Sequence, residues 1–541
     1  MSRSRRLAVT LGVLAVPAIA GGALLQSRAS REGPQLFSEV LGLVGNRYVD
    51  TVSANGLYEK AARGLVKELN DPYSELLSPK QLQGFETRTG GRYGGVGMQI
   101  ENQQGNITVA RVFPHTPAER AGIREGDRIV QVDTATTRGW TLDQTSQALI
   151  GTPGTRVNVR FNRPGVSDPI AVTFTRAIIR IPAVNVAIEL DGDVGYIQFQ
   201  QFNETATEEV RDAVVQLQRM GAKGVILDMR ENPGGILEEA IQVSNLFLER
   251  GQDIVSVRGR GGMQQTTSAP DAPLSTSIPL VVMVNQYSAS ASEIVAGALQ
   301  DHDRALIVGT TSFGKGLVQS VFRLDGGWAL KITTAKWYTP SGRLIQKERA
   351  MNAAGEYVEV RPDSLEGDSV KKVRPAFRSD AGRVVYGGGA ITPDLIVKPD
   401  TISTVEQAFV KALAPKSQDV YVVLHDYALE LRNQLGSNAN FQLQPAWREE
   451  FYRRLQGKGV TLDRTLFDGA SRYVDRILEN RIARHFGDSV AVRREVDDDR
   501  QLSKAVELLR RATSQRDLFA MAQQENARTA SAPTPAARPR Q

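Results

Sequence analysis

The sequence predicts an α/β fold within a chain of several domains. Its 541 residues are roughly three to four times the usual size of one domain. With 41% hydrophobic and 23% charged residues, the chain has enough apolar side chains to close several cores, which excludes a wholly disordered protein. Between about residues 176 and 400, apolar strand-like runs alternate with helical patterns, which is typical of an α/β sheet. The strand-like runs are Gly195–Phe199, Gly224–Asp228 and Leu280–Val284, and the helical patterns are Glu208–Met220 and Leu237–Leu248.

The N-terminal residues 1–28 have the pattern of an export signal. Three arginines within the first six residues precede an uncharged run from Leu7 to Leu25, which contains the small-x-small pattern Ala18-Ile19-Ala20. The length of the run lies between that of a cleaved signal and that of a membrane span, so an uncleaved anchor in the inner membrane is the alternative. In both cases we expect the body of the protein to be periplasmic or otherwise extracytoplasmic.

The rest of the chain divides where the residue pattern changes. We expect an N-terminal helical segment over residues 29–91, a β-rich domain over 92–175, the α/β core over 176–400, a C-terminal helical region over 401–526, and a disordered tail over 527–541.

Composition excludes several classes of site. Cysteine is absent, so disulfides, thiolate metal sites and a cysteine nucleophile are impossible. The chain lacks the H-E-x-x-H motif of zinc proteases, and we expect no metal or other cofactor. The formal charge of +6 is spread along the chain without the basic and aromatic clusters of a nucleic-acid surface, so we expect no nucleic acid as a partner.

A glycine-rich loop in the β-rich domain is a candidate site for a peptide carboxylate. Gly95, Val96, Gly97 and Met98 directly precede an alternating strand, and successive backbone N–H groups in such a loop can bind an anion. Thr141 and Gln144 form a capping box that opens a short helix, which Gly151 should end. A groove between that strand and helix would accept an extended peptide as an added strand.

A serine-rich turn is the candidate catalytic segment. The buried-type strand ending at Val284 leads through Ser288, Ser290 and Ser292 into an apolar helix. The unpaired N–H groups at a helix start stabilise a developing oxyanion, so a serine there is well placed for acyl transfer. Ser290 and Glu293 also form a capping box, so a plain helix cap is the alternative, and the residues alone do not choose among the three serines.

A serine nucleophile needs a general base that accepts its hydroxyl proton. His302 lies about 18 Å away, at the opposite end of the helix, so a Ser-His-Asp triad built on it fails geometrically. The other three histidines lack a comparable motif, but the sequence alone does not exclude them. Lys315 lies between glycines in an apolar stretch, where burial can lower the pKa of a lysine enough for its neutral amine to accept the serine proton. On an extended chain Gln319 projects to the same side as Lys315 and could orient the amine.

The same stretch matches most of the phosphate-binding loop motif, because residues Gly309 to Lys315 have the pattern G-x-x-x-x-G-K. Gly316 stands where a Ser or Thr should bind magnesium, and Leu317–Arg323 alternates like a strand rather than opening a helix. A nucleotide-dependent enzyme is therefore an unfavoured alternative.

Several motifs together resemble those of one family. The β-rich domain resembles a PDZ domain through Gly95–Met98, Pro117–Ile123 and Gly126–Ile129. Over about residues 35–400 the chain resembles the C-terminal processing peptidases, or tail-specific proteases, which are PDZ-containing Ser/Lys serine peptidases. The motifs that carry this second resemblance are Asp228–Gly235, Ser288–Ile294, Phe313–Gly316 with Gln319, Tyr338–Arg343 and Ile391–Asp394.

This resemblance implies a ClpP/crotonase-like catalytic core with an inserted PDZ domain, an N-terminal helical segment and a C-terminal helical extension. It implies an exported serine endopeptidase that recognises protein C-termini and cleaves peptide bonds near them through an acyl-enzyme; the alternative is a catalytically inactive PDZ scaffold. The implied partners are proteins or peptides with exposed C-termini. The helices after about residue 410 could serve an adaptor protein or a homodimer, and a plain packing role is the alternative. The implied site residues are Ser290 as nucleophile, Lys315 as general base, Gln319 as its orienting partner, and Gly234, Gly235 and Ala291 as oxyanion-hole donors.

Overall fold

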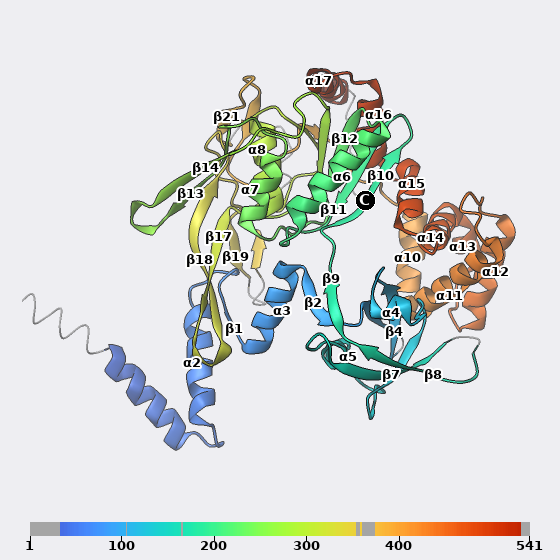
Figure 1. Ribbon diagram of the computed structural model, residues 1–541, viewed down its shortest axis with the longest axis horizontal. Helices are drawn as coiled ribbons and strands as arrows, with labels where there is room; N and C mark the ends of the chain where they lie inside the picture. Colours follow the sequence, from blue (N-terminus) through green and yellow to red (C-terminus); the bar gives the residue numbers. More distant parts are fainter. Residues whose placement is uncertain (1–32, 104, 164–165, 353–356, 360–373, 532–541) are drawn as a thin grey trace, which may run out of the picture. The chain divides into compact units, whose positions relative to one another are not determined.

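The computed structural model describes residues 33–531 except 104, 164–165, 353–356 and 360–373 (Figure 1). The predicted export signal therefore lies outside the described residues. None of the helices in the described part of the chain combines the length and apolar character needed to cross a bilayer. The chain forms two units, Met1–Pro79 with Gln319–Thr333, and Lys80–Val318 with Thr334–Gln541.

The first unit contains helices and a short sheet. Residues 33–47 are helical, and α2 (Ala54–Lys67) begins at Ser53, whose side chain accepts a hydrogen bond from the Gly56 N–H. The strand β1 (Glu75–Leu77) pairs antiparallel with the first residues of β18 (Ala329–Tyr338), which also pairs with β17 (Leu317–Arg323). The strands β17 and β18 are shared between the two units along the chain.

A six-stranded sheet forms the centre of the second unit. Its strand order is β10-β11-β12-β15-β16-β23, and every neighbouring pair except β10 and β11 is parallel. Every residue of β12 and β15 is buried, as expected for a parallel sheet covered on both faces. The predicted α/β fold is confirmed, and the bounds are β10 (Val184–Leu190), β11 (Val194–Phe199), β12 (Gly224–Asp228), β15 (Leu280–Val284), β16 (Leu306–Gly309) and β23 (Leu395–Ile396).

Two layers of helices cover the sheet (Figure 1). Alternate residues of each strand enter two different cores: Val225 and Leu227 belong to one, and Ile226 to the other. The first core is covered by α6 (Ala206–Met220), α7 (Leu237–Asn245) and α8 (Ala291–Asp301). The second core is covered by α16 (Arg500–Arg511) and α17 (Gln515–Ser531), so these C-terminal helices form one layer of the α/β core.

The PDZ-like domain is a sheet of strand order β3-β4-β5-β7-β8, in which β6 pairs with β5. The chain enters and leaves it through the antiparallel pair of β2 (Arg92–Gly95) and β9 (Ala177–Arg180). Both hydrogen bonds of the predicted capping box form between Thr141 and Gln144 at the start of α5. The other elements are β3 (Met98–Gln103), β4 (Asn106–Val112), α4 (Pro117–Arg120), β5 (Arg128–Val132), β6 (Ala135–Thr136), α5 (Leu142–Leu149), β7 (Arg156–Asn162) and β8 (Ile170–Thr175).

Smaller elements complete the second unit. β13 pairs with the last residues of β18 and with β14, and two hairpins form from β19 with β20 and from β21 with β22. Their bounds are β13 (Asp253–Gly259), β14 (Gln264–Ser268), β19 (Arg349–Met351), β20 (Tyr357–Glu359), β21 (Ala376–Arg378) and β22 (Val384–Tyr386).

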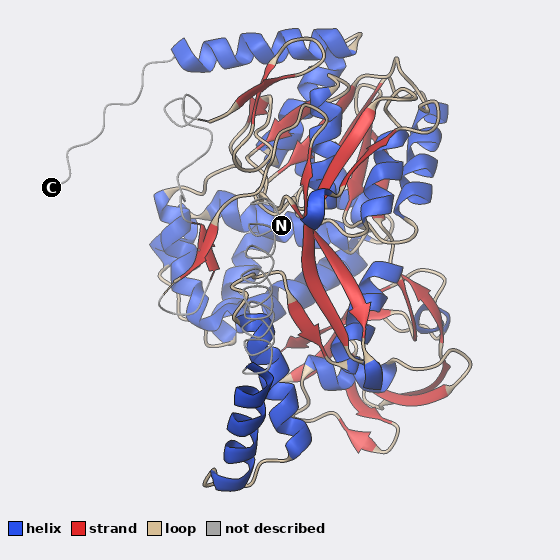
Figure 2. Cartoon of the chain, turned by 90° about the vertical axis from the view of Figure 1, so that its left-hand side faces the viewer, coloured by secondary structure: helices blue, strands red, loops and turns tan. Residues whose placement is uncertain are grey.

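The C-terminal helical region belongs to two cores. Figure 2 shows the helices of the described chain in blue and its strands in red. The helices α10 to α14 bury their apolar faces against one another, and α15 (Asp488–Asp498) contributes Ala491 to that bundle and Val492 to the central sheet. The helix α17 runs through Ser531, so residues 527–531 are helical rather than part of a disordered tail; residues 532–541 lie outside the described residues. The bundle helices are α10 (Thr404–Leu413), α11 (Ser417–Leu435), α12 (Pro445–Gly457), α13 (Arg464–Gly469) and α14 (Ser471–Arg484).

This bundle contacts the PDZ-like domain through a buried histidine pair. The imidazoles of His425 and His485 meet edge to face with 5.1 Å between ring centroids, and His485 Nδ1 lies 3.0 Å from a carboxylate oxygen of Glu125. His425 is 1% exposed, and neither of its ring nitrogens has a hydrogen-bond partner among the described residues. Burial, followed by the charges of His485 and Arg481, lowers the pKa of His425 to about 4, while Glu125 opposes this effect.

We expect His425 to make folding stability depend on pH. Its pKa falls from the ordinary 6.5 in the unfolded chain to about 4 in the folded one, so below pH 6.5 only the unfolded chain takes up this proton. The resulting stability is fully present above pH 6.5 and is lost as the pH falls toward 4, at a cost of up to about 3 kcal/mol. Urea unfolding between pH 4 and 7 measures this slope, which His425→Leu should flatten.

The matched control is His115→Asn, because His115 is exposed. This variant should keep the wild-type slope. An identical pH slope in wild type and His425→Leu would contradict the prediction.

Candidate active site

The serine-rich turn connects β15 to α8, and Ser290 has an unusual backbone conformation in it. Its φ of 55° and ψ of −111° lie in a region that residues with a side chain rarely adopt, and α8 begins at the next residue, Ala291. Strained residues of this kind cluster at functional sites, where the surrounding structure holds them. The conformation therefore favours a functional role for Ser290 over that of an ordinary helix cap.

Hydrogen bonds distinguish the three serines that the sequence leaves equivalent. The hydroxyl of Ser288 donates to the Met229 carbonyl at 2.8 Å, and that of Ser292 donates to the Asn232 carbonyl at 2.9 Å. Both side chains are fully buried, whereas Ser290 is partly exposed. Ser288 and Ser292 thus hold the turn in place, and Ser290 is the one that a substrate could reach.

The carboxylate of Glu293 joins the serine turn to the lysine segment. Its Oε2 accepts from the main-chain N–H groups of Ser290 and Lys315, each at 2.9 Å. Its Oε1 accepts from the Gly314 N–H at 2.6 Å and from the Ser312 hydroxyl at 2.5 Å. Burial raises the pKa of Glu293, and these four hydrogen bonds oppose that rise by favouring the ionised form.

The main chain of Lys315 is held on both sides. Its N–H donates to Glu293, and its carbonyl accepts from the Trp337 indole at 3.0 Å. The side chain is partly buried. β17 begins at Leu317, so the segment leads into a strand and not into the helix that a phosphate-binding loop requires.

Gln319 belongs to the first unit, whereas Ser290 and Lys315 belong to the second. Its side-chain amide donates to the Thr333 hydroxyl at 3.3 Å, within that first unit. Its role as the orienting partner of Lys315 therefore stays a prediction.

The glycine turn after β12 packs directly against the serine turn. Gly234 has a φ of +92°, and a Cβ atom there would lie 2.6 Å from the Ala289 carbonyl oxygen and 2.8 Å from the Ala291 nitrogen. The Gly234 N–H donates to the Asn232 side chain at 2.9 Å. Among the described residues, the N–H groups of Gly235 and Ala291 have no hydrogen-bond acceptor. Of the three predicted oxyanion donors, Gly235 and Ala291 are therefore available in this arrangement, and Gly234 is engaged.

The candidate carboxylate loop lies between β2 and β3. Gly97 has a φ of +89°, and its carbonyl accepts from the Thr116 hydroxyl at 3.2 Å, while the Val96 carbonyl accepts from the Ala118 N–H at 2.8 Å. Among the described strands, β3 pairs with β4 alone, and near its C-terminal end the Asn102 carbonyl accepts from the Gln418 side chain of α11 at 3.2 Å. The loop is thus fixed by its carbonyl groups beside an edge strand.

His302 is the C-cap of α8, at the opposite end from Ser290, as the helix geometry predicts. Its Nδ1 lies 2.7 Å from Asp380 and its Nε2 lies 2.7 Å from the Asp253 carbonyl oxygen. Within the described ranges, no group of three or more His, Asp or Glu side chains is arranged to hold a metal ion.

Sequence reasoning assigned Glu293 to the capping box but missed its contact with the lysine segment. The motif S-x-x-E identifies the bond from the Ser290 N–H. It gives no signal for acceptance from Gly314 and Lys315, which lie 21 and 22 residues further along the chain. The second role follows only from the tertiary structure.

Comparison with known families matches two parts of the chain. Residues 193–363 match the family described as Peptidase family S41. Residues 108–163 match the PDZ domain. The first match includes the serine turn, Glu293 and the lysine segment, and the second includes most of the strands of the PDZ-like domain.

Curated relatives share much of the chain. A carboxy-terminal-processing protease of Bartonella bacilliformis is 39% identical over 317 residues, which are 57% of this chain and 72% of the relative. The carboxy-terminal processing protease CtpA of Bacillus subtilis is 33% identical over 344 residues, 63% of this chain and 73% of the relative. A carboxyl-terminal-processing protease of a Picosynechococcus species is 40% identical over 284 residues, 52% of this chain and 68% of the relative.

We expect Glu293→Gln to weaken both folding and activity. The amide has one acceptor oxygen, so its NH₂ group would face N–H donors that the carboxylate now accepts. The free energy of unfolding should fall by roughly 2–4 kcal/mol. Urea unfolding and the rate of Ser290 modification by a serine-reactive fluorophosphonate would measure the two effects.

The matched control is Glu406→Gln, since Glu406 forms the exposed capping box of α10. It should cost less than about 1 kcal/mol. Equal losses of stability in the two variants would show that Glu293 is only a cap.

We expect Gly234→Ala to abolish activity, because the new methyl group would collide with the Ala289 carbonyl and the Ala291 N–H. Gly221→Ala separates this collision from backbone strain, because Gly221 has a φ of +106° and an added Cβ there would meet no atom within 4 Å. Gly221→Ala should lose about 1 kcal/mol of stability and retain activity. Retained fluorophosphonate modification in Gly234→Ala would contradict the close packing of the two turns.

Proposed function

The chain belongs to the C-terminal processing peptidases of family S41, a serine-type family that its motifs predict, and from this premise we propose that Ser290 is its nucleophile and Lys315 its general base. The observation that carries the proposal is the Glu293 carboxylate, which accepts from the main-chain N–H groups of both residues. One buried anion thereby holds the serine turn and the lysine segment against each other.

The chemistry follows from these groups. The neutral amine of Lys315 takes the proton of Ser290 as the serine oxygen attacks the peptide carbonyl carbon. The N–H groups of Gly235 and Ala291 stabilise the oxyanion of the tetrahedral intermediate. The protonated lysine then gives its proton to the leaving amine, and an acyl-enzyme forms. Water, activated by the same lysine, hydrolyses the acyl-enzyme, and Gln319 orients the amine.

Substrate capture is the role that we propose for the PDZ domain. The free carboxylate of a protein C-terminus binds the loop Gly95–Met98, and the preceding residues pair with the edge of β3 that no described strand pairs with. This arrangement selects unstructured chain ends, because a folded segment cannot add a strand to that edge.

We also propose that the enzyme acts outside the cytoplasm. The support is the sequence of the N-terminus, in which arginines precede an uncharged run from Leu7 to Leu25. The inner-membrane anchor, the adaptor protein and the homodimer remain predictions of the sequence.

We expect Ser290→Ala and Lys315→Ala each to lower cleavage of an unstructured peptide with an apolar C-terminus by roughly a thousandfold or more, because each variant removes a reacting group. Cleavage is followed by mass analysis of the products. Circular dichroism should show that both variants remain folded.

The controls are Ser437→Ala and Lys336→Ala, which change an exposed serine and an exposed lysine. Both should cleave at the wild-type rate. Full activity of either test variant would reject the dyad. Peptide binding by a wild-type protein that never cleaves would support the scaffold alternative.

A further inference from the structure

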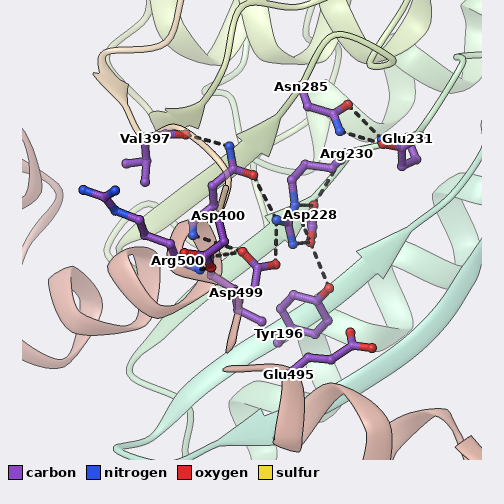
Figure 3. Close-up of polar contacts among 12 residues, drawn as sticks. Tyr196, Asp228, Arg230, Glu231, Asn285, Val397, Asp400, Glu495, Asp499 and Arg500 are labelled. Carbon is purple, nitrogen blue, oxygen red and sulfur yellow. Dashed lines mark hydrogen bonds and ion pairs between the residues drawn. The ribbon is translucent and has the colours of Figure 1, made fainter. Parts of the chain in front are cut away.

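A partly buried arginine next to the glycine turn has two carboxylate partners, one close to it in the chain and one distant (Figure 3). Arg230 follows β12, and its Nη2 lies 2.7 Å from Oδ2 of Asp228, while its Nη1 lies 2.7 Å from Oδ2 of Asp499. Asp499 directly precedes α16, 269 residues further along the chain. The C-terminal extension thus supplies a counter-ion beside the candidate active site.

Gln501 adds a second link from the same helix. Its Oε1 accepts from Nη1 of Arg230 at 3.0 Å, and its Nε2 donates to the Val397 carbonyl at 2.7 Å. Val397 follows β23, at the far edge of the central sheet from β11 and β10. One glutamine therefore joins the carboxyl ends of β12 and β23, where ligands of parallel α/β sheets bind.

The charges in this cluster depend on one another. Burial disfavours the charge of Arg230, but the charges and hydrogen bonds of Asp228 and the charge of Asp499 raise its pKa above the ordinary value. Tyr196 donates to Asp228 at 2.9 Å, and burial followed by the charge of Asp228 raises the pKa of that phenol, so it stays a donor. Removing Asp499 would leave the partly buried charge of Arg230 with Asp228 as its remaining carboxylate partner in this cluster.

The cluster is connected to the serine turn by the residues around Arg230. The Met229 carbonyl accepts from Ser288, and the Asn232 carbonyl accepts from Ser292 and from the Ala289 N–H at 3.0 Å. The Glu231 side chain accepts from Asn285 at 2.8 Å, next to the same turn (Figure 3). A shift of Arg230 would therefore move the groups that hold Ser290 and the Gly235 N–H.

We propose that Asp499 and Gln501 are positioning residues for the peptidase reaction, which hold Arg230 and through it the glycine and serine turns. The inference rests on the proposed function of Ser290 and Lys315. Both residues lie outside the segment that matches the peptidase family, residues 193–363. The C-terminal helix thus completes the catalytic machinery without contacting the substrate.

The test is Asp499→Asn in the full-length chain. Asparagine caps a helix as well as aspartate does, so the variant removes the charge and keeps the cap of α16. We expect kcat for the peptide with an apolar C-terminus to fall roughly tenfold or more while KM stays within about twofold, because misplaced reacting groups slow chemistry without weakening distant binding. The rate of Ser290 modification by a fluorophosphonate should fall in parallel.

Two aspartates serve as matched controls. Asp463→Asn changes the aspartate cap of α13, and Asp400→Asn removes a charge that accepts from the Arg500 N–H at the start of α16 itself. Neither touches Arg230, and both should keep the wild-type kcat. An equal fall in Asp400→Asn would mean that disturbing the helix start is sufficient, which would overturn the proposal.

The remaining outcomes separate the two proposals. If wild type neither cleaves the peptide nor reacts with the fluorophosphonate, the proposed function fails. If wild type is active and Asp499→Asn keeps kcat within twofold, the positioning role fails. Should circular dichroism show Asp499→Asn to be unfolded, Gln501→Leu is measured instead, since it keeps Asp499 and the cap. An unchanged kcat in that variant would also overturn the proposal.

Discussion

The buried carboxylate of Glu293 is the interaction on which the candidate site depends. It is fully buried, and removing such a charge from water is costly unless hydrogen bonds replace the lost hydration. Four donors from two segments provide that replacement, so the charge is tolerable only when the segments containing Ser290 and Lys315 are both in place. The same bonds that solvate the anion thereby fix the positions of the two main chains.

The glycine turn after β12 is also held by the hydrogen bonds of one buried polar residue. Asn232 is fully buried; its side chain donates to the Phe199 carbonyl and accepts from the Gly234 N–H, while its own carbonyl accepts from Ser292. With these bonds satisfied, the turn can lie against Ala289 and Ala291 at a distance that only glycine permits at position 234.

The sequence predicted the strands β11, β12 and β15 because apolar runs of that length between turns are distinctive. It also predicted the capping box at Thr141 and the bond from the Ser290 N–H to Glu293, since these are local patterns. It could not choose Ser290 over Ser288 and Ser292, because that choice depends on carbonyl groups of Met229 and Asn232. The sequence also could not predict which C-terminal helices pack in the bundle and which pack on the central sheet. An amphipathic pattern shows that a helix has an apolar face, but not which element covers that face.

The layer formed by α16 and α17 has a consequence for the order in which the molecule forms. These helices follow every strand of the central sheet along the chain, and until they are synthesised the face that includes Ile226, Val281 and Met283 lacks their cover. Arg230 likewise lacks Asp499 until α16 is made. A nascent chain therefore cannot complete the ion pairs of Arg230 until α16 has been synthesised.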